Sequence, residues 1–328
     1  MSSNKLPLYY LGLSVTLLLL MLMSLSTGAI HIPLNKLLYL AQHHHDSSVE
    51  NMIMHIVRMP RTLCAVLVGG ALALSGVILF YIARNDLACP SLLGINQGVY
   101  LGITLSVVTS HSLVFGSLFA YGIFFGAVAG LLTFLVTFKL GFSPLKLILT
   151  GQAMNLLCYA ACQLLLMLAP AQADSLLTNL NGSLANSSWG LIQSFAGILL
   201  LMIICTLIFI KKNYILSLGE EMAKSIGLNV VAYLILFLAI ILVICTCSVA
   251  MAGPLLFFPL LAVQCSKFII SSNRPYHFAV ISILIGSILL LASDVLIRSL
   301  YHNWEAPLNI FIAMLGVPML IIRARSMR

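Results

Sequence analysis

Few residues of this chain could do chemistry, and the most conspicuous group lies early in the sequence. It is a histidine-rich stretch that also holds two acids: His43, His44, His45, Asp46, Glu50 and His55. Imidazole and carboxylate groups are ligand types that bind transition metals. Three adjacent histidines cannot all face one ion, so a solvated loop is the favoured interpretation and a metal-capture site is the alternative.

Two residue pairs inside apolar runs could also carry chemistry. Ser75 followed by Gly76 would suit an intramembrane serine hydrolase, but such an enzyme needs a partner histidine on another helix. Every histidine of the chain falls in a loop or at the end of an apolar run. Cys158 and Cys162 are one helical turn apart and could bind a soft metal, although small apolar packing residues are the simpler interpretation. We therefore predict no catalytic residue, no metal site and no cofactor.

Nucleotide chemistry is excluded on a different ground. The chain has no Gly-x-x-x-x-Gly-Lys-Ser/Thr sequence, which is the usual device for holding ATP phosphates. If ATP drives this protein, the ATPase is another polypeptide, and this chain is not an enzyme.

Three arginines are the remaining candidates for a functional site. Arg58 and Arg61 flank Pro60, just before a long apolar run. Arg298 follows Asp294 by one helical turn, so this pair could be internal. Two interpretations stay open here. The arginines anchor the chain at the membrane interface through snorkelling side chains, or they bind an acidic partner.

The elements that position these residues are membrane spans. Charged residues make up 7% of the chain and hydrophobic residues 61%, whereas an ordinary soluble domain has about 25% charged residues. A bilayer core takes about 20 apolar residues per helical crossing. We predict an all-α polytopic membrane protein with one transmembrane domain over residues 1–328. The expected spans are 8–27, 61–81, 91–110, 114–138, 146–169, 191–210, 231–251, 255–272, 278–297 and 307–324.

The basic residues predict the orientation of these spans. With a cytoplasmic N-terminus, the inner side holds twelve of the 16 lysines and arginines and the outer side only Lys36, Arg58, Arg61 and Arg298. This asymmetry satisfies the positive-inside rule, and ten spans place both termini in the cytoplasm. The net charge of +8 is thus a topology signal rather than a nucleic-acid footprint, because no basic run alternates with aromatic residues.

Two loops have features of their own. The long outer loop 28–60 contains a segment, 33–42, whose apolar spacing fits a short interfacial helix. The inner loop 211–230 predicts a short amphipathic helix that Ser217 caps together with Glu220, as in a capping box. Glu220 and Lys224 would pair along this helix, and Gly227 would end it.

Seven blocks of the sequence resemble the permease family of bacterial ABC importers for ferric siderophores, ferric citrate, haem and vitamin B12. Residues 58–76 read RMPRTLCAVLVGGALALSG and residues 84–98 read RNDLACPSLLGINQG. The likeness continues through 147–151, 181–189, 216–227, 252–254 and 306–318. It covers nearly the whole chain in order. The block that contains Cys89-Pro-Ser-Leu-Leu-Gly-Ile-Asn96 leans toward the ferric dicitrate type.

This resemblance implies a multi-pass permease of the bacterial inner membrane that moves a ferric chelate by alternating access. It implies cytoplasmic ATPase subunits, a periplasmic substrate-binding protein, a second permease subunit and surrounding lipid as partners. Arg58, Arg61 and Arg298 would bind acids of the binding protein. The fifth and tenth spans would line the path. The ATPase would contact a coupling helix at 216–228, with Ser217, Gly219, Glu220, Glu221, Lys224 and Gly227, and the inner gate would be Ser143, Pro144, Leu145 and Lys146.

One departure from the family pattern concerns the eighth span. After Ala252-Gly-Pro254 the family usually has a proline and a histidine that this chain lacks, and Pro259 stands at a different place. We therefore expect this helix to begin or bend differently. Two alternatives to the importer remain: a secondary metal or chelate transporter that works without an ATPase, and an intramembrane hydrolase built on Ser75.

Overall fold

The structure is a computed structural model that describes residues 6–28, 32–33, 36, 48–86, 88–110, 115–140, 144–168, 182–300, 307–314, 316 and 318. Every regular element within these residues is helical, as the sequence predicts. The elements are α1 (Leu6–Ser26), α3 (Val49–Met52), η2 (Ile53–Arg58), α4 (Met59–Ala83), η3 (Pro90–Leu93), α5 (Ile95–Ser110), α6 (Phe115–Lys139), α7 (Pro144–Leu168), α9 (Trp189–Leu218), α10 (Glu220–Ser225), α11 (Val230–Ala252), α12 (Phe258–Ile269) and α13 (Pro275–Leu300). Residues 308–314 are helical as well.

Seven helices in the described part of the chain are long and apolar enough to cross a bilayer. They match seven of the predicted spans, although α9 continues to Leu218, well past the expected end at residue 210. The third predicted span is shorter than expected, because η3 and a break at Gly94 precede α5. The predicted helix within 33–42 lies outside the described residues.

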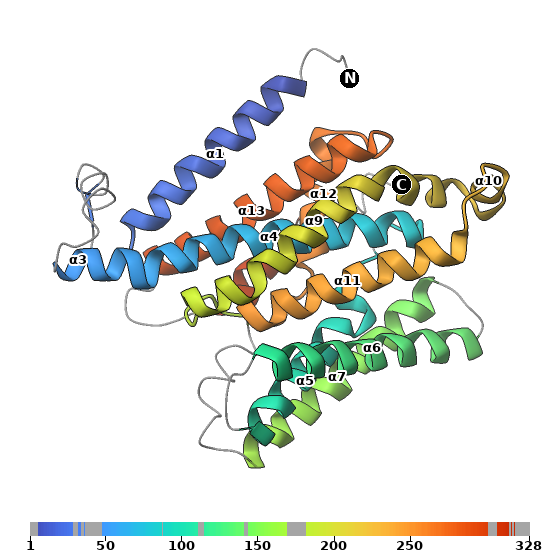
Figure 1. The fold of residues 1–328 in the computed structure, drawn as a ribbon, viewed down its shortest axis with the longest axis horizontal. Coiled ribbons are helices and arrows are strands. Elements are labelled where there is room, and N and C mark those ends of the chain that lie inside the picture. The colour runs from blue at the N-terminus through green and yellow to red at the C-terminus, as the bar shows by residue number, and fades with distance from the viewer. Residues whose placement is uncertain are drawn as a thin grey trace.

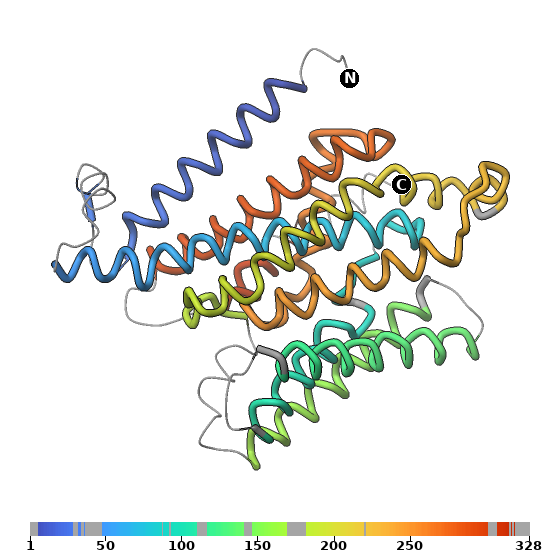
Figure 2. The backbone as a smooth tube through the Cα atoms, viewed as in Figure 1, coloured from blue at the N-terminus to red at the C-terminus, as the bar shows by residue number. Residues whose placement is uncertain are grey.

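α4 runs through the centre of the bundle, with α13, α9, α11 and α12 packed around it (Figure 1). α5, α6 and α7 form a second group beside α11, and α1 leans against α13 on the far side (Figure 2). Small residues set these distances. A Cβ on Gly69 would lie 2.5 Å from the carbonyl oxygen of Gly286, so only glycines permit this approach of α4 to α13. The small residues of the second predicted span therefore serve tight packing.

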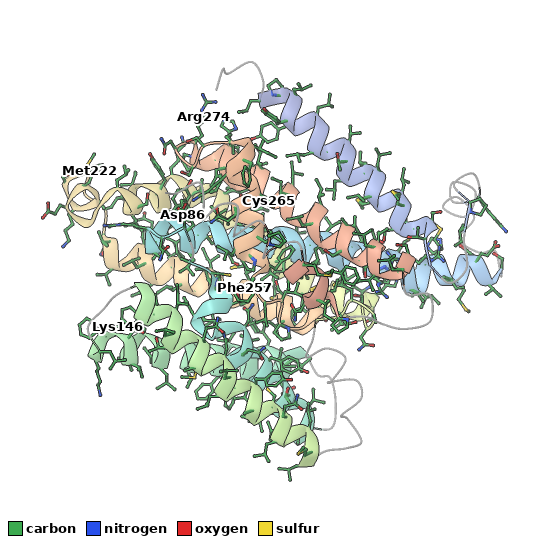
Figure 3. The ribbon with its side chains drawn as sticks, turned by 180° about the vertical axis from the view of Figure 1, so that it is seen from behind. Asp86, Lys146, Met222, Phe257, Cys265 and Arg274 are labelled. Carbon is green, nitrogen blue, oxygen red and sulfur yellow. The ribbon has the colours of Figure 1, made fainter. Side chains whose placement is uncertain are left out.

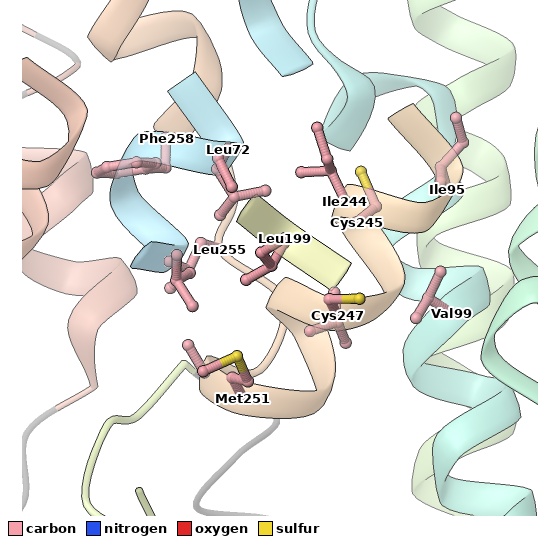
Figure 4. Close-up of a cluster of buried hydrophobic side chains, with 14 of the residues drawn as sticks. Leu72, Ile95, Val99, Leu199, Ile244, Cys245, Cys247, Met251, Leu255 and Phe258 are labelled. Carbon is pink, nitrogen blue, oxygen red and sulfur yellow. The ribbon is translucent and has the colours of Figure 1, made fainter. Parts of the chain in front are cut away.

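The largest apolar core joins the two groups of helices. Leu72, Val99, Leu199, Ile244 and Met251 are buried in it, and they come from α4, α5, α9 and α11 (Figure 4). By contrast, α1 exposes leucines on most of its surface, as a helix surrounded by lipid does.

The chain between α11 and α12 is not helical and lies in the interior of the bundle. Phe257, which precedes α12, has a positive φ of 58° and lies midway between the two ends of the bundle (Figure 3). α12 then begins at Phe258 with Pro259 in its first turn, where a proline costs no hydrogen bond. The predicted span 255–272 therefore extends three residues beyond α12 at each end, and the expectation that this helix begins or bends differently from the family pattern stays a prediction.

The bundle has two distinct ends. The last residues of α6, the first residues of α7 and the helix α10 lie at one end, and α3 lies at the other (Figure 1). Lys146 and Met222 mark the first of these ends (Figure 3). We call them the α10 end and the α3 end.

Candidate functional site: a polar path face and two ends

A buried carboxylate organises the α3 end. Asp294 of α13 is fully buried, and its Oδ1 accepts a hydrogen bond of 2.9 Å from Nε of Arg61. Nη2 of Arg61 lies 2.8 Å from the same oxygen, and Nη2 of Arg298 lies 2.9 Å from Oδ2. Asp294 therefore joins the start of α4 to the end of α13. The sequence indicated its pairing with Arg298, one turn away, but not the pairing with Arg61.

Two of the arginines also cap the C-terminal end of α1. Nη1 of Arg58 donates to the carbonyl oxygens of Leu25 and Ser26, at 2.6 and 2.9 Å. Nη1 of Arg298 donates to those of Ser24 and Thr27, at 3.0 and 3.2 Å. The last carbonyls of a helix have no partner within it and carry partial negative charge, so guanidinium groups stabilise this end.

The geometry of this arginine cluster, Arg58, Arg61 and Arg298 around Asp294, differs from the expected docking surface. Arg58 is only 4% exposed, and all three guanidiniums already bind groups of this chain. The reason is that α1 ends beside α4 and α13, which the order of spans in the sequence does not indicate. The internal pairing that the sequence left open for Arg298 is confirmed, and a docking role for these arginines stays a prediction.

A π-helical turn, η2, leads into α4 at the same end. Pro60 has no N–H to offer the carbonyl of His55 five residues earlier. The indole Nε1 of Trp189 donates to that carbonyl at 2.7 Å and so ties the start of α9 to η2.

At the other end, α10 forms the short helix expected between two spans. Gly227 ends this helix with a positive φ of 79°. The N–H of Gly227 donates to the carbonyl oxygen of Lys224, and the N–H of Leu228 donates to the carbonyl oxygen of Ala223. These two bonds form a Schellman motif, so the predicted helix stop at Gly227 is confirmed. Met222 and Ile226 are exposed apolar residues on this helix, and Glu221 and Lys224 are exposed charged ones.

The predicted cap of this helix was wrong. Ser217 belongs to the last turn of α9 and donates to the carbonyl of Tyr214 at 2.6 Å. Gly219 is the N-cap instead, with φ 136° and ψ 151° and no side chain to offer. A capping box needs a chain that leaves the helix before Ser217, and α9 continues past that point. The side chain of Glu220 lies outside the described residues.

The predicted inner gate falls partly within the described chain. Ser143 lies outside it, and Pro144 and Leu145 begin α7. Nζ of Lys146 donates to the carbonyl of Leu140 at 2.6 Å, just past the end of α6. This lysine therefore joins the first turn of α7 to the residue that follows α6.

α7 has a polar face that was not predicted from the sequence. Gln152, Asn155, Tyr159 and Gln163 are spaced three to four residues apart along an otherwise apolar helix. Tyr159 is exposed, and its hydroxyl accepts a hydrogen bond of 3.0 Å from Gln163. Polar side chains within a membrane face a bundle interior or a water-filled cavity rather than lipid. The spacing of these polar residues at one helical turn within an apolar run was the signal in the sequence from which this face could have been predicted.

This polar face opens onto a cavity of about 120 Å³, which we call the junction pocket. It is lined by Ser91 of η3, Gln97 of α5, Gln152, Asn155 and Tyr159 of α7, and Phe257. Leu256 and Leu156 complete the described lining. The pocket thus lies where two interruptions of the helical backbone meet.

Side chains satisfy the non-helical backbone beside the pocket. Oγ of Ser91 accepts from the N–H of Phe257 at 3.2 Å, and the Ser91 carbonyl accepts from Nδ2 of Asn155 at 2.8 Å. Asn309 binds the same loop twice: its Oδ1 accepts from Leu256 N–H, and its Nδ2 donates to the Pro254 carbonyl, both at 2.9 Å. Irregular backbone at membrane depth requires such partners. These bonds join α7 to the helix that contains Asn309.

The candidate hydrolase serine and the candidate metal ligands form no catalytic or metal-binding group within the described residues. Ser75 is buried and donates to the carbonyl of Leu72 on its own helix, and a Cβ on Gly76 would meet the Pro259 carbonyl at 2.7 Å. This is a packing position. The described histidines, cysteines and acids form no group of three that could hold a metal. His43, His44 and His45 lie outside the described chain. Cys158 and Cys162 are buried free thiols.

Comparison with known proteins identifies the family of this chain. The FecCD transport family matches residues 16–326. The Fe(3+)-citrate import system permease protein YfmD of Bacillus subtilis is 33% identical over 330 residues, which cover 100% of this chain and 97% of the relative. The Fe(3+) dicitrate transport system permease protein FecD of Escherichia coli is 31% identical, over 93% of this chain and 95% of that protein. The Molybdate import system permease protein MolB of Haemophilus influenzae is also 31% identical, over 97% and 96%.

A solved structure supports the same assignment. It is described as an inward-facing conformation of a putative metal-chelate type ABC transporter, and it matches with a TM-score of 0.80 and 29% identity. The match covers 98% of this chain and 99% of that chain. Matches of sequence and fold over nearly the full length agree, and this chain belongs to the FecCD transport family.

Proposed function

We propose that this chain is the transmembrane permease subunit of an ABC importer that carries a ferric chelate, of the citrate or siderophore type, across the bacterial inner membrane. Its membership of the FecCD family and its near full-length likeness to Fe(3+)-citrate permeases support the assignment. The cargo moves by alternating access, and this chain does no chemistry on it. ATP hydrolysis takes place on a separate subunit.

The polar face of α7 is the observation that carries this function. A helix with an exposed Tyr159 and half-buried Gln152 and Gln163 beside a polar pocket suits a water-filled path and suits lipid poorly. A second permease subunit facing α7 would enclose that path. The pair then alternates between two states, and the binding protein and the ATPase bias the equilibrium from opposite sides.

Ten spans with both termini cytoplasmic remain the proposed topology. α5, α12 and the helix of residues 308–314 add three shorter or partly described crossings to the seven long helices. Basic residues gather at the α10 end, where Lys139, Lys146, Lys224 and Arg274 are exposed. By the positive-inside rule this end is cytoplasmic.

The same orientation assigns the partner contacts. α10 presents Met222 and Ile226 beside exposed charges at the cytoplasmic end, which suits an ATPase subunit. The α3 end then faces the binding protein. Arg58, Arg61 and Arg298 position the helices that form this surface, and their direct contact with acidic residues of that partner is open to test.

Co-purification in mild detergent tests the proposal. We expect an ATPase with a Walker motif at a copy number equal to that of the permease, and uptake of the ferric chelate by vesicles only when ATP is supplied. A chain that purifies alone and moves a metal or chelate without ATP would be a secondary transporter, and the proposal would be wrong.

A further inference from the structure

The exposed apolar face of α9 ends in two adjacent lysines near the α10 end of the bundle. Ile204 and Ile208 are both more than half exposed on this face, as side chains that contact lipid are. Lys211 and Lys212 follow Ile208 by three and four residues, so they continue the same face. From Trp189, which begins the helix, to Lys211 the helix rises roughly 33 Å, which is about the thickness of a bilayer core. With Trp189 at one membrane interface, the lysines lie at the level of the phosphates of the other leaflet.

Aromatic side chains hold the ammonium group of Lys212 in place. This group donates a hydrogen bond to the hydroxyl of Tyr233 on α11. Its Nζ also lies 4.7 Å from the ring centroid of Tyr233 and 5.4 Å from that of Phe209, within the range of cation–π attraction. The side chain is half-buried between α9 and α11 rather than extended into water. The bond to Tyr233 uses one of the three N–H donors of the ammonium group, so Lys212 is a positioned donor with further capacity.

The two lysines form no salt bridge with any residue that the structure describes. The described salt bridges involve other cations: Lys36, Arg61, Lys267 and Arg298. Two adjacent positive charges at the edge of an apolar layer repel each other and attract an anion, because the low dielectric constant there strengthens both interactions. Phospholipid phosphates are the anions present at this depth.

The surfaces beside the lysines are apolar on both helices. Val231, Ile235 and Leu238 are exposed on α11, which packs against α9. α11 lies between α9 and the group formed by α5, α6 and α7 (Figure 1), so a second subunit that faces α7 leaves the exposed face of α9 to lipid. A phospholipid whose headgroup binds the lysines would lay its acyl chains along these side chains. A free phosphate ion has no part that would use this apolar surface.

We infer that Lys211 and Lys212 bind the headgroup phosphate of an anionic phospholipid in the leaflet at the α10 end. Tyr233 and Phe209 are positioning residues that hold the ammonium group of Lys212 for this contact. The inference goes beyond the proposed function, because it depends on the membrane and not on the cargo. α10 connects α9 to α11, so a lipid bound here steadies the two helices from which α10 extends.

The test measures lipid binding to the full-length chain, purified in detergent with the subunits that accompany it, by native mass spectrometry. The probes are phosphatidylglycerol, which has a net negative charge, and phosphatidylethanolamine with the same acyl chains and no net charge. Lys211→Gln with Lys212→Gln removes both charges of the site. Lys139→Gln with Arg274→Gln is the matched control, because it removes two exposed positive charges at the same end of the bundle, outside α9 and α11.

A further variant separates a positioned site from general surface charge. Tyr233→Leu keeps both lysines and removes the hydroxyl and the ring that hold Lys212. Inorganic phosphate, added at a concentration equal to that of the lipid, tests whether a free anion occupies the same place.

We expect the wild-type chain to bind phosphatidylglycerol about tenfold more tightly than phosphatidylethanolamine. The variant without Lys211 and Lys212 should bind the two lipids about equally, and Tyr233→Leu should weaken binding of phosphatidylglycerol about threefold. The control pair should keep the wild-type preference to within about twofold, by the small effect of distant surface charges.

Three results would overturn the inference. The first is a preference for phosphatidylglycerol that survives the loss of both lysines, and the second is an equal loss in the control pair, since general surface charge would then explain the binding. The third is displacement of the lipid by inorganic phosphate, which would assign the site to a free anion. An unchanged preference in Tyr233→Leu would overturn the positioning role of the aromatic side chains. None of these results bears on ATP-dependent uptake, so the proposed function is tested separately.

Discussion

Charged residues are arranged differently at the two ends of this bundle. At the α3 end, charged groups are buried and bind one another and the last carbonyls of α1. At the α10 end, a short helix flanked by Gly219 and Gly227 exposes charged and apolar side chains. The first arrangement fixes the positions of three helices, whereas the second leaves a surface free for a partner. Charged groups are therefore part of the internal structure at the α3 end, whereas at the α10 end they are exposed, and there we propose that the ATPase binds.

The largest effect is expected from reversing the charges at the α3 end. Arg58→Glu with Arg61→Glu places a new acid beside Asp294 and removes the bonds of Arg58 to the last carbonyls of α1, so we expect little folded permease. The fraction that elutes as a single species from size-exclusion chromatography in detergent measures this. Lys139→Glu with Arg274→Glu makes the same change of charge at exposed sites and should fold normally. Normal folding of the first variant with lost affinity for the binding protein at low salt would restore the docking interpretation.

A smaller loss is expected from removing the shared carboxylate. Asp294→Ala leaves Arg61 and Arg298, whose side chains are only 13% and 11% exposed, without their counter-ion; removing one partner of a fully buried pair costs about 3–5 kcal/mol, which is the upper limit here. The apparent Tm should fall clearly, as measured by thermal unfolding in detergent. An unchanged Tm would mean that Asp294 contributes little to stability and that the carbonyls of α1 are sufficient to hold Arg298.

A single hydrogen bond at the same end should matter less. Trp189→Phe keeps an aromatic ring at the start of α9 and removes the N–H that binds the carbonyl of His55. We expect a loss of about 1 kcal/mol in the free energy of unfolding. Stability equal to that of the wild type would show that other contacts hold η2 against α9.

The smallest effect on stability should come from the α10 end. Glu220→Lys with Glu221→Lys changes the first turn of an exposed helix, so the apparent Tm should stay within a degree or two of the wild type, by roughly the cost of a surface substitution. Uptake should nevertheless be uncoupled from ATP hydrolysis, which we would measure as iron moved per ATP consumed. Asn273→Lys, an exposed change at the same end, should leave that ratio intact. Intact coupling in the double variant would show that the ATPase binds elsewhere.

The sequence alone was sufficient for the class of fold, because lipid imposes a simple rule. Helices longer than about 18 apolar residues satisfy their own backbone, and seven such runs are helices in the structure. The end of α10 at Gly227 was also predictable from the sequence, because the left-handed backbone conformation that ends a helix favours glycine. The blocks at 58–76 and 84–98 also carried the family resemblance.

Only the tertiary structure decided which polar groups meet. Arg61 binds Asp294 across 233 positions of sequence, and Asn309 binds a loop more than 50 residues earlier. Ser217 could cap a helix only if α9 ended before it, and the packing of α9 against α4 extends that helix instead. Local patterns report on the residues within one or two helical turns, whereas these contacts depend on the order in which distant helices pack. That is why the sequence indicated a permease, and the fold had to show which of its buried polar groups meet.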